Sequence, residues 1–563
     1  MVLARIRGAS AVGVCLCALA WSPLIPGASA ENRTIDGGGN NPADADIGRA
    51  GTMLSRMVLS DYGDGVSTPA GGDRPDPRAI SNGVFNQAAS SPDPRGLSAF
   101  VWAWGQFLDH DIDLTPAHEP AEAFDIDVTG DLMFDPQGQG AVLELDRSMY
   151  APSSAPRQQL NMITAWIDGS NVYGSDTARA GALRSGSGGR LATSTGNFLP
   201  CNTLGFENAQ LPFQDDQDMF LAGDIRANEN VALTAMHTVF MREHNRIATE
   251  AALANPGWDD GQLYEWARKI VGAEMQAITY GQFLPAFGVE IAPYDGYQSQ
   301  VDGTILNEFS TAAYRVGHSM VTPMLMRIDE TGAPIPAGHL SLMEAFFAPD
   351  RFAESGVEPI MLGLLAQTEQ AIEAQVVDEL RHFMFGPPGS PGGGLDLVSL
   401  NIQRGRDHGL ASYASLRQEL GLGTVDGFDD IMSDTEVQAN LATVYGTVDK
   451  VDPWVGMLAE DIVPGASIGA TLKHILEVQF TALRDGDRFY FENDSALSAA
   501  IVADLRATRL SDVIMRNTTI DVMTDNIFFS SAVPEPGTAA MLCVLAPFLW
   551  RSGPRSRSRQ TSD

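Results

Sequence analysis

The chain has 563 residues, of which 71 are acidic and 36 are basic, so its formal charge at pH 7 is −35. Apolar residues make up 44% of the chain, which is enough to bury a large core and excludes an intrinsically disordered protein. The strong negative charge repels nucleic acid and anionic lipid, and we therefore expect no nucleic-acid partner.

The first 30 residues have the three-part layout of a secretory signal peptide. Two arginines precede an apolar run at 9–20, and the small residues Ala-Ser-Ala at 28–30 follow as a cleavage pattern. The run is too short to span a membrane, and prolines interrupt its continuation. We expect residues 1–30 to be removed and the protein to be secreted or held at the cell surface.

The segment 31–530 is expected to form one large, mainly α-helical domain with very little sheet, because it has no long linker, no internal repeat and scarce strand-like alternation. Apolar residues recur at spacings of three and four, which predicts helices at 97–108, 158–166, 231–253, 263–284, 361–385 and 468–483. The segments 285–303 and 386–394 are expected to be surface loops. Cys201 is the one cysteine in this domain, so an intramolecular disulfide is not available.

The segment 104–113, Trp-Gly-Gln-Phe-Leu-Asp-His-Asp-Ile-Asp, holds the densest group of reactive side chains. On a helix, Gln106 and His110 are four residues apart and share one face, whereas Asp109 and Asp111 point to its sides. One helix could therefore serve a pocket with one face and a metal with another. A histidine near carboxylates is also compatible with a structural role, and composition alone does not choose between the two.

A second group of polar side chains lies in the loop 164–170. Thr164, Asp168 and Ser170 alternate with other residues and supply the oxygen ligands that a hard cation such as Ca²⁺ prefers. Without a metal, the same pattern would be a loop stabilised by its own Asp and Ser side chains.

Three later motifs carry further candidate residues. Arg226 lies in Ala-Gly-Asp-Ile-Arg-Ala-Asn-Glu, His318 in Tyr-Arg-Val-Gly-His-Ser-Met, and Asn401 in Asn-Ile-Gln-Arg-Gly-Arg-Asp-His-Gly. Taken by themselves, Arg226 could be the ion-pair partner of a neighbouring acid, and His318 could be a buried core histidine.

In their order and spacing, these motifs resemble those of the animal haem peroxidase family, which belongs to the peroxidase–cyclooxygenase superfamily. The resemblance extends from Arg-Thr-Ile-Asp-Gly at 33–37 to Gly-Asp-Arg-Phe-Tyr-Phe-Glu-Asn at 486–493, which is almost the whole expected domain. It implies a large helical domain that encloses haem b and uses hydrogen peroxide to oxidise small donors.

On the distal side of the haem, the resemblance implies that His110 is the acid and base. Peroxide cleavage needs a group that takes a proton from one oxygen and returns it to the other, so that water leaves, and a histidine can do both near neutral pH. Gln106 matches the glutamine that hydrogen-bonds pocket water or halide. Arg226 matches the arginine whose charge stabilises the separating oxygen.

Asp109 and Glu229 match the two acids that form ester bonds to the haem in this family, which would hold and distort the macrocycle. Some members carry a methionine directly after this glutamate and form a third link through its sulfur, but this chain has Asn230. We therefore expect bromide, iodide, thiocyanate or small organic reductants, rather than chloride, as donors.

On the proximal side, the resemblance implies that His318 is the iron ligand and that Asn401 holds its other ring nitrogen. Arg315 and Arg404 match arginines that surround this side and a haem propionate. Three further histidines are assigned to structural roles and packing, although two of them share a helix face and could suggest a metal pair: His237, His244 and His408.

The same resemblance assigns a calcium site to the loop 164–170 and the distal helix. Its ligands would be the carboxylates of Asp111 and Asp168, the hydroxyl groups of Thr164 and Ser170, and the carbonyl groups of Thr164 and Trp166. Because Asp111 directly follows His110, loss of the cation should displace the distal base.

Residues 531–563 resemble the PEP-CTERM sorting signals of bacterial exopolysaccharide producers. Val-Pro-Glu-Pro at 533–536 is followed by the apolar run 539–550 and an arginine-rich end. The resemblance implies a bacterial protein whose tail engages the membrane and a sorting or processing machinery. A plain single-span anchor is the alternative, although the run is short for a bilayer.

Two other functions compete with a peroxidase. Cyclooxygenases and fatty-acid dioxygenases use a tyrosyl radical three residues before the proximal histidine, where this chain has Arg315, with Tyr314 one position away. A non-catalytic, acidic matrix or adhesion protein could keep the fold for its bulk. The complete set of distal and proximal residues favours a peroxidase over both.

Overall fold

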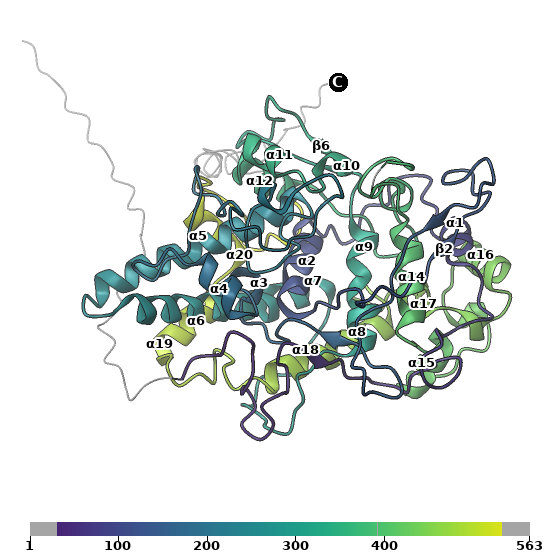
Figure 1. Ribbon diagram of the computed structural model, residues 1–563, viewed down its shortest axis with the longest axis horizontal. Helices are drawn as coiled ribbons and strands as arrows, with labels where there is room; N and C mark the ends of the chain where they lie inside the picture. Colours follow the sequence, from purple (N-terminus) through teal and green to yellow (C-terminus); the bar gives the residue numbers. More distant parts are fainter. Residues whose placement is uncertain (1–30, 391, 532–563) are drawn as a thin grey trace, which may run out of the picture.

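The computed structural model describes residues 31–390 and 392–531, which form a mainly helical structure with small two-stranded sheets (Figure 1). The mainly helical fold with very little sheet, expected from the sequence, is confirmed. The expected signal segment and nearly all of the expected tail, residues 1–30 and 532–563, lie outside the described residues. Within the described ranges, none of the helices has the length and hydrophobicity needed to cross a membrane.

Twenty α-helices follow one another in the described part of the chain. They are α1 (Pro77–Val84), α2 (Phe100–Ile112), α3 (Ser170–Tyr173), α4 (Thr177–Leu183), α5 (Val231–Ala254), α6 (Asp260–Ile278), α7 (Leu284–Phe287), α8 (Asn307–Thr311), α9 (Gly317–Met320), α10 (Leu342–Ala345), α11 (Pro349–Ser355), α12 (Glu358–Ala366), α13 (Asp378–Arg381), α14 (Leu397–Asp407), α15 (Tyr413–Glu419), α16 (Thr435–Tyr445), α17 (Pro453–Ala459), α18 (Ala470–Asp485), α19 (Ala499–Ala507) and α20 (Leu510–Asn517). A π-helical turn, η2 (Thr279–Phe283), joins α6 to α7, and a 3₁₀ turn, η3 (Ala313–Val316), leads into α9.

Three antiparallel pairs of two-residue strands brace the loops between these helices. They are β1 (Thr52–Met53) with β4 (Leu160–Asn161), β2 (Ile126–Asp127) with β3 (Val142–Leu143), and β5 (Met324–Leu325) with β6 (Leu340–Ser341). Thr52 lies opposite Asn161 and Met53 opposite Leu160. This pairing fixes residues 52–53 beside the segment that leads into the loop 164–170.

The helices expected at 97–108, 231–253, 263–284 and 468–483 are present as α2, α5, α6 with its π turn, and α18. The helix expected at 158–166 is wrong. Leu160 and Asn161 form β4, and the Asn161 amide bonds the carbonyl of Ile112 at 2.7 Å and the N–H of Leu114 at 2.9 Å. This tertiary pairing holds the backbone extended in spite of its apolar spacing.

The single helix expected at 361–385 is also wrong, because α12 ends at Ala366 and only the short α13 follows. After α12 the chain becomes extended and pairs with the segment before α2. The N–H of Ala99 donates to the carbonyl of Gln367 at 2.9 Å, and the N–H of Glu369 donates to that of Leu97 at 3.0 Å. The expected loops contain no helix or strand among the described residues, except that α7 covers the first residues of 285–303. Cys201 is free and exposed.

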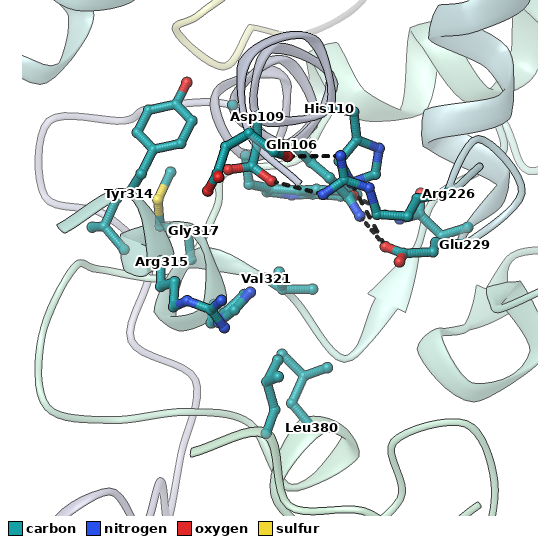
Figure 2. Close-up of a pocket in the computed structure, with 18 of the residues that line it drawn as sticks. Gln106, Asp109, His110, Arg226, Glu229, Tyr314, Arg315, Gly317, Val321 and Leu380 are labelled. Carbon is teal, nitrogen blue, oxygen red and sulfur yellow. Dashed lines mark hydrogen bonds and ion pairs between the residues drawn. The ribbon is translucent and has the colours of Figure 1, made fainter. Parts of the chain in front are cut away.

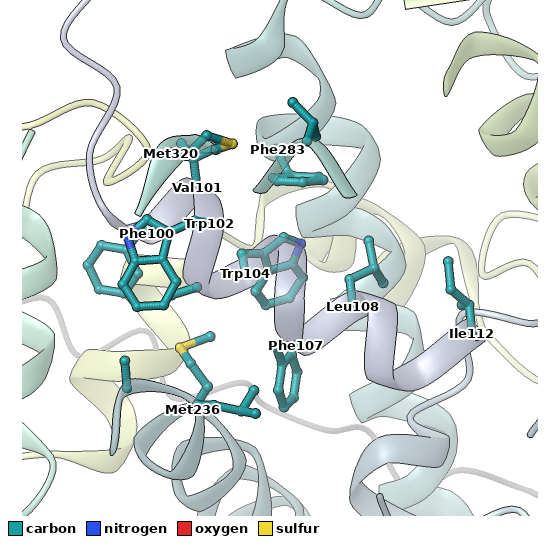
Figure 3. Close-up of a cluster of buried hydrophobic side chains, with 14 of the residues drawn as sticks. Phe100, Val101, Trp102, Trp104, Phe107, Leu108, Ile112, Met236, Phe283 and Met320 are labelled. Atoms are coloured by element: carbon teal, nitrogen blue, oxygen red, sulfur yellow. The ribbon is translucent and has the colours of Figure 1, made fainter. Parts of the chain in front are cut away.

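Helix α2 lies at the centre of the hydrophobic core (Figure 3). Phe107 stacks on Phe240 of α5 with ring centroids 5.0 Å apart, and Trp104 packs against both rings. Trp104 and Phe107 are fully buried. Truncating such side chains to alanine costs about 3–5 kcal/mol, so α2 is held rigidly and can position side chains on its opposite face.

The two ends of the described chain are joined by buried polar contacts. Arg33 forms an ion pair with Asp487, and the Asn40 amide donates to the same carboxylate at 2.9 Å. Gln276 of α6 donates to Asp487 at 3.0 Å. The first described residues therefore pack against α6 and the segment that follows α18.

Candidate active site

A cavity of about 380 Å³ lies between α2 and the turn formed by η3 and α9. Figure 2 shows Gln106, Asp109 and His110 grouped with Arg226 and Glu229 on one side, and Arg315 and Gly317 on the other. Three histidines line this one cavity: His110 and His318, from two elements that are more than 200 positions apart, and His408. Its wall also contains apolar side chains from distant segments, among them Phe283, Leu342, Phe346, Leu380 and Phe385.

His110 is buried on α2 and is available as a base. Burial, and next the charge of Arg226, hold the pKa of His110 well below its ordinary value, so the ring is neutral near pH 7. Its Nδ1 atom makes no hydrogen bond and lies 3.6 Å from Oδ1 of Asp224. Its Nε2 atom lies 3.9 Å from Oε2 of Glu229. A neutral ring in this position can accept a proton from a molecule in the cavity.

Arg226 is held at the cavity by a bidentate pair with Asp224. Its Nε and Nη2 atoms each donate to the Asp224 carboxylate at 2.9 Å, and Nη2 also donates to the carbonyl of Asp113 at 2.8 Å. Although burial opposes ionisation of both groups, their mutual attraction raises the pKa of Arg226 and lowers the pKa of Asp224. The guanidinium is thus a fixed positive charge beside His110.

Gln106 is held at both ends of its amide. Its Nε2 atom donates to Oε2 of Glu229 at 2.8 Å, and its Oε1 atom accepts from Nδ2 of Asn230 at 2.8 Å. Burial raises the pKa of Glu229 to about 7, against the opposing charge of Arg226. Burial and next Asp113 raise the pKa of Asp109. Both carboxyl groups, which the sequence assigned to haem esters, face the cavity.

His318 lies on α9 with Asn401 of α14 beside it, as the sequence predicted. Nδ2 of Asn401 lies 2.7 Å from Nδ1 of His318, and Oδ1 of Asn401 accepts from Nη1 of Arg315 at 3.1 Å. Burial, helped by the charge of Arg315, lowers the pKa of His318 to about 3. A neutral imidazole with one supported ring nitrogen is suited to metal ligation through the other.

Arg315 and Arg404 both line the cavity, and burial lowers the pKa of each guanidinium. Nη1 of Arg404 donates to the carbonyl of Asp146 and to Oγ of Ser148, both at 2.8 Å. Both contacts are made by the Nη1 atom of the guanidinium. The two arginines therefore place positive charge where an anionic group of a bound cofactor would be stabilised.

The three histidines assigned to packing have surroundings that support this assignment. His408 is hydrogen-bonded through both ring nitrogens, to Ser148 at 2.7 Å and to Asn307 at 2.8 Å. His244 is hydrogen-bonded to Tyr173 and Gly189, whereas His237 has no hydrogen bond and packs against Phe107.

The loop 164–170 comes together with α2, as expected for a cation site. Oδ2 of Asp111 accepts from the backbone N–H of Asp168 at 3.1 Å, and Oδ1 of Asp168 accepts from the Thr164 hydroxyl at 3.1 Å. The Ser170 hydroxyl donates to the carbonyl of Asp111 at 2.7 Å. Trp166 is fully buried in the same loop.

Two buried carboxylates, Asp111 of α2 and Asp168 of the loop, lack a positive partner in direct contact. Burial raises the pKa of Asp111, and next the charge of Asp168 raises it further. Oδ2 of Asp168 is buried and makes no hydrogen bond. The described residues contain no cluster of three or more His, Cys, Asp or Glu that could hold a metal, so a cation here would need hydroxyl and carbonyl oxygens as well. This donor set fits a hard cation.

Sequence reasoning missed two acids of the site. Asp224 was considered only as an alternative explanation for Arg226, yet it is the carboxylate that positions this arginine and faces His110. Asp113 lines the cavity and is buried. It is the C-cap residue of α2, and the available signal was its place at the end of the acidic run that follows Gln106.

The site is a cavity in a large helical domain, lined on one side by the neutral His110 and on the other by His318, whose ring is supported by the Asn401 amide. A sequence profile of the animal haem peroxidase family matches residues 32–528. The chain belongs to this family.

Several known proteins are similar to this chain. Peroxidasin of Drosophila melanogaster is 35% identical over 559 residues, covering 88% of this chain and 36% of peroxidasin. Human eosinophil peroxidase is 35% identical, covering 89% of this chain and 77% of that protein. The structure of peroxidase A from Dictyostelium discoideum has a TM-score of 0.84 and 32% identity, covering 89% of this chain and all of that one.

The chain spans about a third of the length of the peroxidasin relatives that it matches. A fatty acid alpha-dioxygenase of Oryza sativa has a TM-score of 0.75 with 21% identity, covering 89% of this chain and 87% of that chain. The similarity to the dioxygenase structure shows that the two proteins share a fold.

Proposed function

We propose that the protein is a secreted peroxidase that reduces hydrogen peroxide and oxidises small donors, with haem b bound between His110 and His318. The observation that carries the proposal is that two neutral histidines line one cavity. His110 has a ring nitrogen without a hydrogen bond and lies beside Arg226, which Asp224 holds in place. His318 is supported by Asn401. The similarity to proteins named peroxidases supports the same conclusion.

The haem, when bound, supplies the iron that accepts oxidising equivalents from peroxide and passes them to donors. His110 takes a proton from one peroxide oxygen and returns it to the other, so that the leaving group is water rather than hydroxide. Its lowered pKa keeps the ring ready to accept that proton at neutral pH. Arg226 stabilises negative charge on the separating oxygen, because Asp224 holds its guanidinium in place before the reaction begins.

The remaining cavity residues would hold the cofactor. His318 would ligate the iron, and Asn401 would fix the orientation of its ring. Arg315 and Arg404 would pair with the propionate groups. Asp109 and Glu229 face the cavity and would form ester bonds to the haem edge.

We propose a calcium ion in the loop 164–170, bound by oxygen atoms of Asp111, Thr164, Trp166, Asp168 and Ser170. The two buried carboxylates and the unpaired Oδ2 of Asp168 support this assignment, because a divalent cation would neutralise them. Since Asp111 is adjacent to His110, the cation would also fix the C-terminal turn of α2.

We further propose that donors are bromide, iodide, thiocyanate or small organic molecules, that the protein acts outside the cell, and that a bacterial sorting machinery processes its tail. The proposals for the tail and for the signal segment rest on the order of residue types in the sequence alone. Fatty-acid oxygenation is the weaker alternative, because Arg315 stands at the position expected for a radical tyrosine and hydrogen-bonds Asn401 instead.

Protein loaded with hemin and Ca²⁺ should show a Soret absorption band and should oxidise guaiacol or iodide only when peroxide is present. Oxygen uptake with linoleate in place of peroxide would instead identify a dioxygenase. A colourless, inert protein would identify a non-catalytic matrix protein.

Two variants separate the roles of the histidines. His110→Ala should keep the Soret band but slow the reaction with peroxide by a factor of about 100 or more, because general acid–base catalysis contributes 10²–10⁴-fold. His318→Ala should lose the native absorption. His474→Ala, on α18 and away from the cavity, is the matched control. Wild-type rates in both cavity variants would refute the assignment.

A further inference from the structure

A series of aromatic rings in contact begins at the cavity. Tyr314 lines the cavity (Figure 2) and packs edge-on against Phe480 of α18, with the ring centroids 5.8 Å apart. Phe480 packs in turn against Tyr280 of the π-helical turn η2, with the centroids 6.4 Å apart. The hydroxyl group of Tyr280 donates to the backbone carbonyl of Phe480 at 2.9 Å. This bond fixes the two rings beside each other.

The series continues into the loop 285–303. The ring of Tyr280 packs against that of Tyr490 at 5.7 Å, and Tyr490 packs against Tyr294 at 4.7 Å. Tyr490 is buried, whereas Tyr294 is half-buried, so the series ends at the protein surface. Electron transfer slows steeply with distance, and here every step joins rings that pack against each other. Phe480 is the one ring in the series without a phenol and can only bridge its neighbours.

Arg484 holds two of these rings together. The central carbon of its guanidinium lies 5.9 Å from the centroid of the Tyr280 ring and 5.5 Å from that of the Tyr294 ring. A positive charge would by itself oppose the loss of an electron from either ring. Nε of Arg484 lies 2.7 Å from Oδ1 of Asp485, however, so this charge is balanced.

The two ends of the series differ in charge. The cavity is lined by the guanidinium groups of Arg226 and Arg315, which favour small anionic donors. At the other end, burial and next the charge of Asp487 raise the pKa of Tyr294, and the charge of Asp485 adds to this effect. Acidic groups near Tyr294 repel anions, so a donor that reacts there would be neutral or cationic.

The size of the cavity limits what can react inside it. Its volume of about 380 Å³ is that of a site for one small molecule, and a bound haem would occupy much of it. A donor much larger than a simple phenol would therefore have to be oxidised elsewhere on the protein.

We propose that this aromatic series conducts electrons from Tyr294 to the cavity, and that Tyr294 is a surface site for the oxidation of neutral or cationic phenols that are too large to enter the cavity. The inference rests on the proposed peroxidase function, which supplies the oxidant. It adds a second class of donor to the small donors of the cavity.

The reaction at Tyr294 balances as follows. Each peroxide molecule withdraws two electrons at the cavity, and each is replaced by an electron drawn from Tyr294 along the series. The phenolic proton of Tyr294 passes to the carboxylate of Asp485. A phenol outside the protein then gives one electron to the Tyr294 radical, which recovers its proton, while the proton of that phenol passes to water. Two phenols become two phenoxyl radicals for each peroxide that is reduced to two water molecules.

Two variants interrupt the series while keeping its rings. The donors are tyramine attached to a high-molecular-weight dextran, which cannot enter the cavity, and guaiacol, which can. In haem-loaded Tyr294→Phe, we expect oxidation of the dextran-bound phenol by peroxide to fall at least about tenfold, while guaiacol is oxidised at the wild-type rate. Tyr280→Phe should have the same effect, because it removes an intermediate phenol and leaves Tyr294 in place.

A second readout locates the radical without measuring turnover. Wild-type protein treated with peroxide and a nitroso spin trap should carry the trap on Tyr294, as identified by mass spectrometry of its peptides. In Tyr280→Phe this label should be lost. Tyr297→Phe is the matched control, because Tyr297 is half-buried in the same loop and its hydroxyl group also makes no hydrogen bond. This variant should keep both the label and the rates of the wild type.

An undiminished rate on the dextran-bound phenol in Tyr294→Phe and Tyr280→Phe, or a label on Tyr294 that persists in Tyr280→Phe, would overturn the proposal. Wild-type protein that oxidises guaiacol but forms no label on Tyr294 would overturn it too, and would leave the peroxidase function intact. Protein that binds haem but oxidises neither donor would overturn the peroxidase function and the surface site together.

Discussion

Gly223→Ala tests whether the position of Arg226 depends on close backbone packing. A Cβ atom on Gly223 would lie 2.3 Å from the carbonyl oxygen of Ser170, 2.5 Å from N of Gly174 and 2.6 Å from N of Tyr173. All three are backbone atoms of α3 and its end, so no side chain can rotate away. The next residue, Asp224, is fixed to the same helix by a hydrogen bond from its N–H to the carbonyl of Asn171 at 3.0 Å.

The segment that carries Asp224 and Arg226 must then move by roughly 1 Å to relieve the overlap, and overpacking of this kind costs about 1–3 kcal/mol of stability. A displacement of about 1 Å at a catalytic group lowers the rate by about 100-fold. We therefore expect Gly223→Ala to react with peroxide about 100 times more slowly while it still binds haem.

The assay is stopped-flow absorption at the Soret band after mixing with peroxide, at a temperature where circular dichroism shows the variant to be folded. Gly181→Ala, on the adjacent helix α4, has no atom within 4 Å of the new Cβ and should keep the wild-type rate. A wild-type rate in folded Gly223→Ala would refute the reasoning that backbone packing positions Arg226.

Two more predictions follow from buried carboxylates. Removal of Ca²⁺ with a chelator should lower the melting temperature and slow the peroxide reaction, because Asp111 adjoins His110; a cation at 100 times its dissociation constant contributes about 2.7 kcal/mol. Asp168→Asn should abolish this response, and an unchanged melting curve after chelation would contradict the site. Glu369 is buried with neither carboxyl oxygen hydrogen-bonded, and burial raises its pKa well above 4.5. The protonated Glu369 side chain therefore makes its full contribution to the free energy of unfolding below pH 4.5. This contribution is lost as the pH rises toward the folded-state pKa, by about 1.4 kcal/mol per pH unit. Glu369→Gln should remove this loss, so its advantage in denaturant unfolding should grow with pH; a constant difference would contradict the prediction.

The residues that line the cavity were predictable because they lie in short motifs whose spacing is itself the geometry. Gln106 and His110 share a face of α2, and the loop 164–170, where a cation site was expected, contacts the same helix through Asp111. The protein environment of these motifs was not predictable in the same way. The pairing of Asp224 with Arg226, and the bond between Asn230 and Gln106, depend on how the segment before α5 crosses α2.

The errors in the predicted helices have a common physical cause. The apolar spacing at 158–166 reflects burial of an extended segment that pairs with β1, and the spacing at 361–385 continues past α12 into a strand-like segment that pairs with the residues before α2. Periodicity reports which side chains are buried, but partners more than 100 residues away decide the backbone conformation. The apolar cavity wall, built from Phe283, Phe346 and Phe385, is hidden for the same reason.

The contacts of Arg33 and Asn40 with Asp487 connect positions more than 440 residues apart. When the chain emerges from a ribosome or an export channel with its N-terminus first, Arg33 and Asn40 cannot contact Asp487 until nearly the whole domain has followed. Folding therefore reaches completion only after synthesis or translocation of the domain is almost finished. Because Gln276 of α6 binds the same carboxylate, the last step of assembly also secures the helix beside the loop 164–170.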